Sequence, residues 1–268
     1  MGAGLPAIIF GLSAAVVVAA SSIGTGVGSS AIAAVAPAES RAHPAAVAKL
    51  PHTQAVANVG DVDCRHLKCI ALTFDDGPGT QTKQLLEMLR RYNAVATWFP
   101  VGEVIAQRPG ALRQIAKAGM EIGDHTWTHA QLTARTDSQI DTEVGRTARE
   151  IQAVTGTRPH LVRPPYGAVT PRVADELGRL GDSVILWDVD PLDWKYRDSN
   201  WVYSSVMRQA HPGAIVLMHD IHATTVAAVP RILRALAEQG YVFVTVSELY
   251  RGTLKAGRIY HGRRLPIG

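Results

Sequence analysis

The sequence predicts an α/β fold in which helices cover a parallel sheet. The main observation is an alternation: about seven short apolar runs are separated by longer amphipathic segments between residues 63 and 250. Alternation of this kind is typical of strand–helix units, whose strands lie parallel in an open sheet or in a closed barrel. The length of 268 residues supports this fold class, because it suffices for one large α/β domain with a buried core, or for two small ones.

The expected strands are short, apolar and bounded by helical patterns. They cover residues 69–74, 94–99, 121–123, 160–162, 183–187, 214–218 and 241–244. Runs of this length suit buried strands, whereas a helix needs a longer segment.

The helices are predicted from spacing and from signals at their ends. Leucines within residues 85–89 lie on one helical face. A second helix is expected to begin near Pro109, because proline suits the first helical turn. A longer helix is expected over residues 137–154, where Ser138 and Asp141 resemble a capping box.

The N-terminal region has the composition of an export signal. Residues 5–20 are apolar, and no charged side chain occurs before Glu39. The apolar run is short for a bilayer span, so residues 1–38 are predicted to be a signal peptide, with an uncleaved membrane anchor as the alternative. Residues 39–62 are rich in alanine and proline without periodicity, and are predicted to be a flexible linker.

Positive charge is concentrated at the C-terminus. The formal net charge is +4, and five basic residues but no acidic residue follow Glu248, so residues 1–248 balance to −1. We expect residues 253–268 to form a basic tail that is either solvated and frayed or in contact with an anionic surface such as a cell wall. No patch interleaves basic and aromatic residues, which argues against a nucleic-acid partner.

The two cysteines, Cys64 and Cys69, flank a short basic stretch. In an exported protein a disulfide between them would close a small loop. A pair of free thiols is the alternative. A zinc knuckle would need further cysteines or histidines in a repeating pattern.

Polar residues follow five of the expected strands. In parallel α/β folds the functional site lies at the carboxyl ends of the strands. The residues found there are Asp75, Asp76, His125, His129, Arg163, Asp193, Trp194 and His219. Chance would scatter such residues over both ends of the strands, so their common placement predicts a site.

Four of these residues suggest metal-dependent chemistry. Asp75 and Asp76 are neighbours, and neighbours on an extended chain point in opposite directions, so one can bind a metal while the other acts as a base. His125 and His129 are four residues apart, which places both imidazoles on one face of a helical turn. Two histidines, one carboxylate and an open position form the arrangement of catalytic zinc sites.

Each of these residues also has a plainer interpretation. The two aspartates precede Gly-Pro and suit an ordinary turn, and the two histidines could lie on the surface. Arg163 could form a salt bridge anywhere. Trp194 could be a core residue rather than a platform for a sugar, and His219 could be a hydrogen-bonded rim residue rather than an acid.

Five motifs, in order, resemble the polysaccharide deacetylases, known as the NodB-homology domain or carbohydrate esterase family 4. They are TFDDGP at 73–78, HTWTH at 125–129, RPPYG at 163–167, DPLDW at 190–194 and LMHD at 217–220. The resemblance covers residues 69–250 and implies a distorted (β/α) barrel with about seven parallel strands. It makes residues 63–252 the catalytic domain, and the chain resembles secreted actinobacterial peptidoglycan deacetylases.

The resemblance implies one divalent metal ion and a base beside it. Asp76, His125 and His129 would bind the ion, expected to be Zn²⁺, with Co²⁺ or another divalent ion as the alternative. Asp75 would be the general base, and Arg163 would hold it ionised and oriented.

The remaining motifs imply an acid and a substrate pocket. His219 would be the general acid, tuned by Asp193. Tyr166 would offer its backbone N–H to the oxyanion. Trp194 and Leu217 would line the pocket for the sugar and the acetyl methyl group.

The activity implied by the resemblance is hydrolysis of N-acetyl groups from a polysaccharide, with peptidoglycan N-acetylglucosamine as the favoured substrate. Acetylated xylan, chitin oligosaccharides or a small cyclic amide are alternatives on the same fold, and export argues against the last. A non-catalytic protein that binds cell-wall glycan is an alternative of another class, which the complete set of base, ligands and acid argues against. We expect a monomer, secreted or associated with the cell envelope, with membrane contact only through an uncleaved N-terminal segment.

Overall fold

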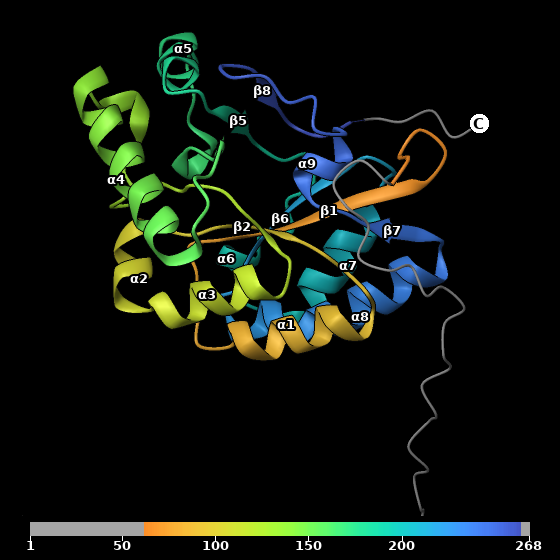
Figure 1. Ribbon diagram of the computed structural model, residues 1–268. Coiled ribbons are helices and arrows are strands. Elements are labelled where there is room, and N and C mark those ends of the chain that lie inside the picture. Colours follow the sequence, from red (N-terminus) through yellow and green to blue (C-terminus); the bar gives the residue numbers. More distant parts are fainter. Residues whose placement is uncertain (1–61, 264–268) are drawn as a thin grey trace, which may run out of the picture. The chain divides into compact units, whose positions relative to one another are not determined.

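The computed structural model describes residues 62–263 (Figure 1). The predicted signal peptide or anchor, the predicted linker up to residue 61, and residues 264–268 lie outside this range. Within residues 62–263, no helix combines the length and the apolar composition that crossing a membrane requires.

The strands form two parallel sheets. They are β1 (Lys68–Asp75), β2 (Thr97–Phe99), β3 (Glu121–Ile122), β4 (Leu161–Val162), β5 (Ser183–Ile185), β6 (Ile215–His219), β7 (Tyr241–Phe243) and β8 (Ile259–Tyr260). One sheet has the order β3-β2-β1-β6 with β7 also paired to β1, and the other has the order β4-β5-β8. Isolated parallel bridges join Asp124 to Val162 and Val189 to Val216, which connects the two sheets. The predicted α/β fold with parallel strands is confirmed.

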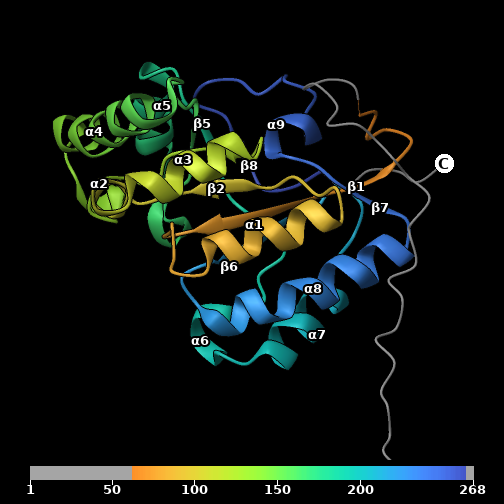
Figure 2. The ribbon, with the colours of Figure 1, turned by 60° about the horizontal axis from the view of Figure 1, so that its bottom comes forward.

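The helices cover the outside of these two sheets. They are α1 (Thr82–Arg91), α2 (Gly102–Gln107), α3 (Pro109–Lys117), α4 (Asp137–Thr155), α5 (Pro171–Arg179), α6 (Asp193–Tyr196), α7 (Ser199–Gln209), α8 (Ala223–Glu238) and α9 (Val246–Leu249), with short 3₁₀ turns η1 (Leu132–Ala134) and η2 (Pro165–Gly167). Figure 2 shows α1, α7 and α8 along one side of β1 and β6, and α4 with α5 at the other end of the molecule.

β1 runs through the centre of the larger sheet and separates two apolar clusters. The cluster on the helix side includes Ile70, Leu72 and Phe74. The cluster on the inner side includes Cys69 and Ala71. Because successive side chains of a strand alternate between faces, Thr73 and Asp75 also point to the inner side. The alternation therefore delivers a carboxylate to the interior at the carboxyl end of β1.

The long helix α4 begins at Asp137 as predicted, but its capping box lies two residues earlier than the sequence suggests. The capping box consists of Thr136 and Gln139, since the Thr136 hydroxyl accepts a hydrogen bond from the Gln139 backbone and the Gln139 side chain bonds back to the Thr136 backbone. The predicted box of Ser138 and Asp141 is wrong, because Ser138 already lies inside the helix. The six-residue helix α2 is a further element that the sequence pattern did not reveal.

Residues 253–263, which the charge distribution suggests as part of a frayed tail, contain β8. This strand pairs with β5, with Ile259 opposite Val184. Just before it, Gly257 packs on Gly178 so closely that a Cβ on Gly178 would lie 2.8 Å from the Gly257 Cα. A two-residue strand has no periodicity that a sequence could display, and this explains why it was missed.

At the amino end of β1, Cys64 and Cys69 are joined by a disulfide bond, with 5.4 Å between their Cα atoms. Both cysteines are buried in the inner cluster. The bond therefore ties the first described residues to the start of the central strand.

Candidate active site

A cluster of ionisable side chains lies at the carboxyl ends of the strands. Asp76 follows β1, His125 and His129 follow β3, Arg163 follows β4, and His219 ends β6. A groove of about 480 Å³ opens beside this cluster, and Asp76, His129, Glu103, Arg108 and Ile221 are among the residues that line it. The structure thus gathers residues that the sequence places at the ends of four different strands.

Asp76, His125 and His129 offer three ligand atoms that all lie within 4.8 Å of one another. The Asp76 Oδ1 atom is 3.5 Å from the His125 Nε2 atom and 3.3 Å from the His129 Nε2 atom. That oxygen is buried and accepts no hydrogen bond from the described residues. A buried carboxylate oxygen without a partner is costly unless a cation satisfies it.

The orientation of His125 suits a metal ligand. Its Nδ1 lies 2.6 Å from the Arg163 carbonyl oxygen, which can only accept, so Nδ1 carries the proton and Nε2 presents a lone pair toward Asp76. Burial lowers the pKa of His125 to about 3, which keeps the ring neutral. On the second histidine, the His129 Nδ1 lies 3.2 Å from the Tyr166 hydroxyl. Outer hydrogen bonds of this kind orient metal-binding histidines, so these residues fit a divalent metal ion.

Asp75 lies on the inner side of the cluster and faces Arg163. The Arg163 Nη1 donates hydrogen bonds to Asp75 Oδ1 and to the Thr73 hydroxyl, both at 2.7 Å. The other guanidinium nitrogens donate to the carbonyl oxygens of Ile185 and Leu186, so the side chain is fixed and fully buried. Burial raises the pKa of the Asp75 carboxyl, while the neighbouring Arg163 charge acts in the opposite direction.

His219 lies on β6, opposite Asp75 of the neighbouring strand β1, and Asp193 holds it. The His219 Nδ1 lies 2.8 Å from Asp193 Oδ1, and the His219 backbone N–H donates to Asp193 Oδ2 at 2.8 Å. Burial disfavours the imidazolium, but the hydrogen bond and charge of Asp193 outweigh it and raise the pKa of His219 to about 9. The free Nε2 points toward Asp76, with 4.0 Å to Asp76 Oδ2.

The three residues expected to contact substrate differ in exposure. Tyr166 is 67% exposed and Trp194 is 49% exposed, while Leu217 is 4% exposed. Tyr166 has a φ of 64°, an uncommon conformation for a residue other than glycine. Leu217 lies on β6 two residues before His219, so the two side chains share a face of the strand.

Three supporting residues escaped prediction. Thr73 accepts from Arg163 and donates to the Val216 carbonyl oxygen, and Thr225 donates to Asp193 at 2.7 Å. Asp220 ends the LMHD motif, but no role was predicted for it. These residues act on partners far away in the chain, so no local pattern marks them.

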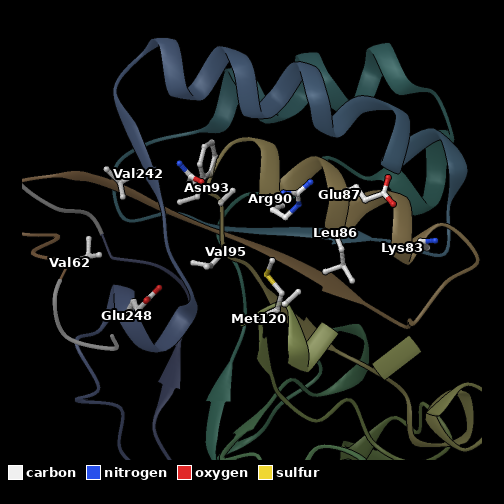
Figure 3. Close-up of a pocket in the computed structure, with 13 residues that line it drawn as sticks. Val62, Lys83, Leu86, Glu87, Arg90, Asn93, Val95, Met120, Val242 and Glu248 are labelled. Carbon is white, nitrogen blue, oxygen red and sulfur yellow. The ribbon is translucent and has the colours of Figure 1, made fainter. Parts of the chain in front are cut away.

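A second pocket, of about 340 Å³, opens near α1, β7 and α9 (Figure 3). Leu86, Val95 and Met120 line it together with Lys83, Glu87 and Arg90. None of the residues that line it belongs to the cluster of Asp75, Asp76 and the histidines. The pocket therefore does not coincide with the candidate active site.

Comparison with known proteins identifies relatives of this chain. A family model described as polysaccharide deacetylase matches residues 63–185. The chain is 43% identical over 194 residues to the peptidoglycan-N-acetylglucosamine deacetylase PgdA of Listeria monocytogenes, a match that covers 72% of this chain and 41% of that protein. This chain therefore spans about two-fifths of the length of that relative.

Two further similar proteins are matched over most of their own length. A peptidoglycan-N-acetylglucosamine deacetylase of Bacillus cereus is 38% identical over 190 residues, which is 69% of this chain and 89% of that protein. A solved structure described as T48 deacetylase with substrate has a TM-score of 0.71 and 40% identity, and the match covers 74% of this chain and 99% of that one.

Proposed function

This chain belongs to the polysaccharide deacetylase family, and from that premise we propose that it hydrolyses N-acetyl groups of a cell-wall polysaccharide and releases acetate. The observation that carries the proposal is the placement of Asp75 and His219 next to the Asp76–His125–His129 cluster, beside an open groove. A base, a metal site and an acid close together match the needs of amide hydrolysis. Peptidoglycan N-acetylglucosamine is the favoured substrate, because the relatives from Listeria monocytogenes and Bacillus cereus are named for it.

Asp76, His125 and His129 would hold the metal ion. The bound ion would supply a Lewis acid for the acetamide carbonyl and lower the pKa of a coordinated water. A set of two imidazoles and one carboxylate suits Zn²⁺, and Co²⁺ is the alternative.

Asp75 would accept the proton of the attacking water through Oδ2. Its Oδ1 is occupied by Arg163 at 2.7 Å, whereas Oδ2 faces the metal side, 3.8 Å from the His125 Nε2. Arg163 therefore fixes which oxygen is free to act. A carboxyl pKa raised by burial suits this role, because a general base works best when its pKa approaches the working pH.

His219 would donate a proton to the departing amine through Nε2. Its Nδ1 is held by Asp193, so the opposite nitrogen is directed to the cluster. A pKa of about 9 keeps the imidazole protonated at neutral pH, as an acid requires. Tyr166 would offer its backbone N–H to the oxyanion, and Trp194 and Leu217 would line the pocket for the sugar and the acetyl methyl group.

The substrate is tested by measuring acetate release from peptidoglycan, chitin oligomers and acetylated xylan, with Zn²⁺ supplied or removed by a chelator. We expect release from peptidoglycan, loss of release after chelation, and recovery when Zn²⁺ returns. Acetate release from acetylated xylan alone would show that the substrate is an ester and not an amide. Bound metal without release from any polymer would favour the non-catalytic wall-binding alternative.

The assignment of the base is tested with Asp75→Asn. We expect metal to remain bound while the rate falls about 10²–10⁴-fold, the usual effect of removing a general base. Asp137→Asn, on the exposed first turn of α4, is a matched control that should keep full activity. Near-normal activity of Asp75→Asn with metal bound would disprove the assignment.

We further propose that the chain acts outside the cytoplasm, at the cell envelope. This placement follows from the apolar composition of residues 1–38 and from the cell-wall substrates named for the relatives. The disulfide between Cys64 and Cys69 supports it, because such bonds persist in oxidising compartments.

A further inference from the structure

We infer that Asp220 is a positioning residue that holds the loop carrying Asp76 and thereby sets the affinity of the metal site. The loop comprises residues 76–81, between β1 and α1. The inference rests on the metal site of the proposed function, and it assigns a residue that lies outside the ligand set. Asp220 is fully buried, so it does not contact a substrate in the groove.

The Asp220 carboxylate collects hydrogen bonds from three separate segments. Its Oδ2 accepts from the Thr82 hydroxyl at 2.5 Å, from the Trp98 indole N–H at 3.1 Å and from the Gly79 backbone N–H at 3.3 Å. These donors belong to the first turn of α1, to β2 and to the loop itself. One buried carboxylate therefore connects the residue after β6 to the loop, to α1 and to β2.

The loop also packs directly on Asp220. A Cβ on Gly77 would lie 2.1 Å from Asp220 Oδ1, and a Cβ on Gly79 would lie 2.4 Å from the Asp220 carbonyl oxygen. Any side chain at either glycine would collide with Asp220. The glycines next to Asp76 are thus explained by the close approach of the loop to this residue.

Asp76 needs such support because its own backbone is strained. Its φ is 69°, in the left-handed region that residues other than glycine rarely adopt. A conformation of this kind persists only where the surroundings enforce it. With Asp76 in this conformation, its Oδ1 points to His125 and His129, at 3.5 and 3.3 Å. If the loop relaxes, the carboxylate moves away from the two histidines.

The experiment measures Zn²⁺ affinity of the full chain by competition with a chromogenic chelator, for wild type, Asp220→Asn and Asp220→Ala. We expect Asp220→Ala to weaken Zn²⁺ binding about 10–100-fold, the usual effect of losing an outer-shell partner of a metal ligand. Asp220→Asn keeps an oxygen that can accept the same hydrogen bonds, so its affinity should lie closer to wild type.

Glu121→Ala is the matched control. Glu121 is a partly buried carboxylate that accepts hydrogen bonds from the Thr97 hydroxyl at 2.8 Å and from the Ser247 backbone at 3.2 Å, at the amino ends of β2 and β3. Its loss should lower the melting temperature, as the loss of Asp220 does, but leave Zn²⁺ affinity unchanged. A purely structural role for Asp220 would make the two alanine variants alike in both measurements.

Thr82→Val provides a milder variant in case Asp220→Ala does not fold. It removes one of the three donors and should weaken Zn²⁺ binding several-fold. Unchanged affinity in Thr82→Val and in every folded Asp220 variant would overturn the inference, and so would an equal loss in Glu121→Ala. Because no substrate is used, absence of acetate release would count against the proposed function and not against the role of Asp220.

Discussion

Replacing Arg163 with methionine would leave the Asp75 carboxylate buried without its counter-charge. Arg163 is fully buried, and its Nη1 donates to Asp75 Oδ1 at 2.7 Å. Removing one partner of a buried ion pair typically costs about 3–5 kcal/mol, because the remaining charge is uncompensated. We therefore expect Arg163→Met to lower the free energy of unfolding by about 3–5 kcal/mol at pH 7.

The assay is urea denaturation of the metal-free protein, with the double variant Arg163→Met/Asp75→Asn in the same series. Removing the carboxylate charge as well should recover part of the loss, since no unpaired charge then remains. Arg172→Met is the control, because Arg172 forms an ion pair with Asp137 in which both side chains are exposed. Such surface pairs contribute little, so the control should change stability far less.

The cost of Arg163→Met should also depend on pH. Burial already raises the pKa of Asp75, and without Arg163 that pKa rises further. A group with a raised pKa in the fold favours the folded state at low pH and loses that contribution as pH rises, so the defect should shrink near pH 4. A buried ion pair between Arg163 and Asp75 would be refuted as a source of stability if Arg163→Met lowered the free energy of unfolding no more than Arg172→Met. It would also be refuted if the added Asp75→Asn recovered none of the loss.

Two further predictions concern the acid and the disulfide. In the metal-free protein, Asp193→Asn should lower the pKa of His219 from about 9, and NMR titration would show it. The pair stabilises the fold fully below the ordinary histidine pKa of about 6.5 and loses this contribution as pH rises through about 9, so the variant should be destabilised more at pH 7 than at pH 10. Cys64→Ser/Cys69→Ser should lower the free energy of unfolding by about 2 kcal/mol by opening a short loop, with unchanged Zn²⁺ affinity. An unchanged His219 pKa in Asp193→Asn would contradict the first prediction. A free energy of unfolding equal to that of wild type in the double cysteine variant would contradict the second.

The fold was largely predictable because its strands are apolar runs between amphipathic helices. The run at residues 69–74 lies within β1, and that at 214–218 overlaps β6. Elements without periodicity were missed: α2 has six residues, and β8 has two. Their stability comes from contacts with distant segments, as in the pairing of β8 with β5, and local sequence carries no record of such contacts.

The sequence predicted the residues that carry the chemistry of the candidate site, but not the residues that hold them in place. Asp76, His125 and His129 carry the ligand types of a metal site, so residue identity and strand-end placement were enough to group them. Thr225 and Asp220 are different, because each acts only through partners brought near by folding. Asp220 bonds to Thr82, which is 138 residues away in the chain.

Alternation along a strand does not fully explain why the Asp75 and Asp76 carboxylates point to different places. Asp75 continues β1 and faces inward, but Asp76 is not extended, since its φ is 69°. The left-handed turn, not the pleat, aims its carboxylate at His125 and His129. Strand alternation alone therefore does not account for the different positions of the two carboxylates.

The end of the neighbouring strand β6 also directs two successive residues, His219 and Asp220, to different places. β6 runs parallel to β1 with His219 opposite Asp75, so the proposed acid and base are set side by side by strand register. The next residue of each strand turns away, with Asp76 carried to the metal site and Asp220 placed beneath the loop that holds it. A slip of one residue between the strands would put a carboxylate in the place of the imidazole and remove the support of the loop. The register of β1 and β6 thus fixes the relative positions of the proposed acid, the proposed base and the candidate metal site.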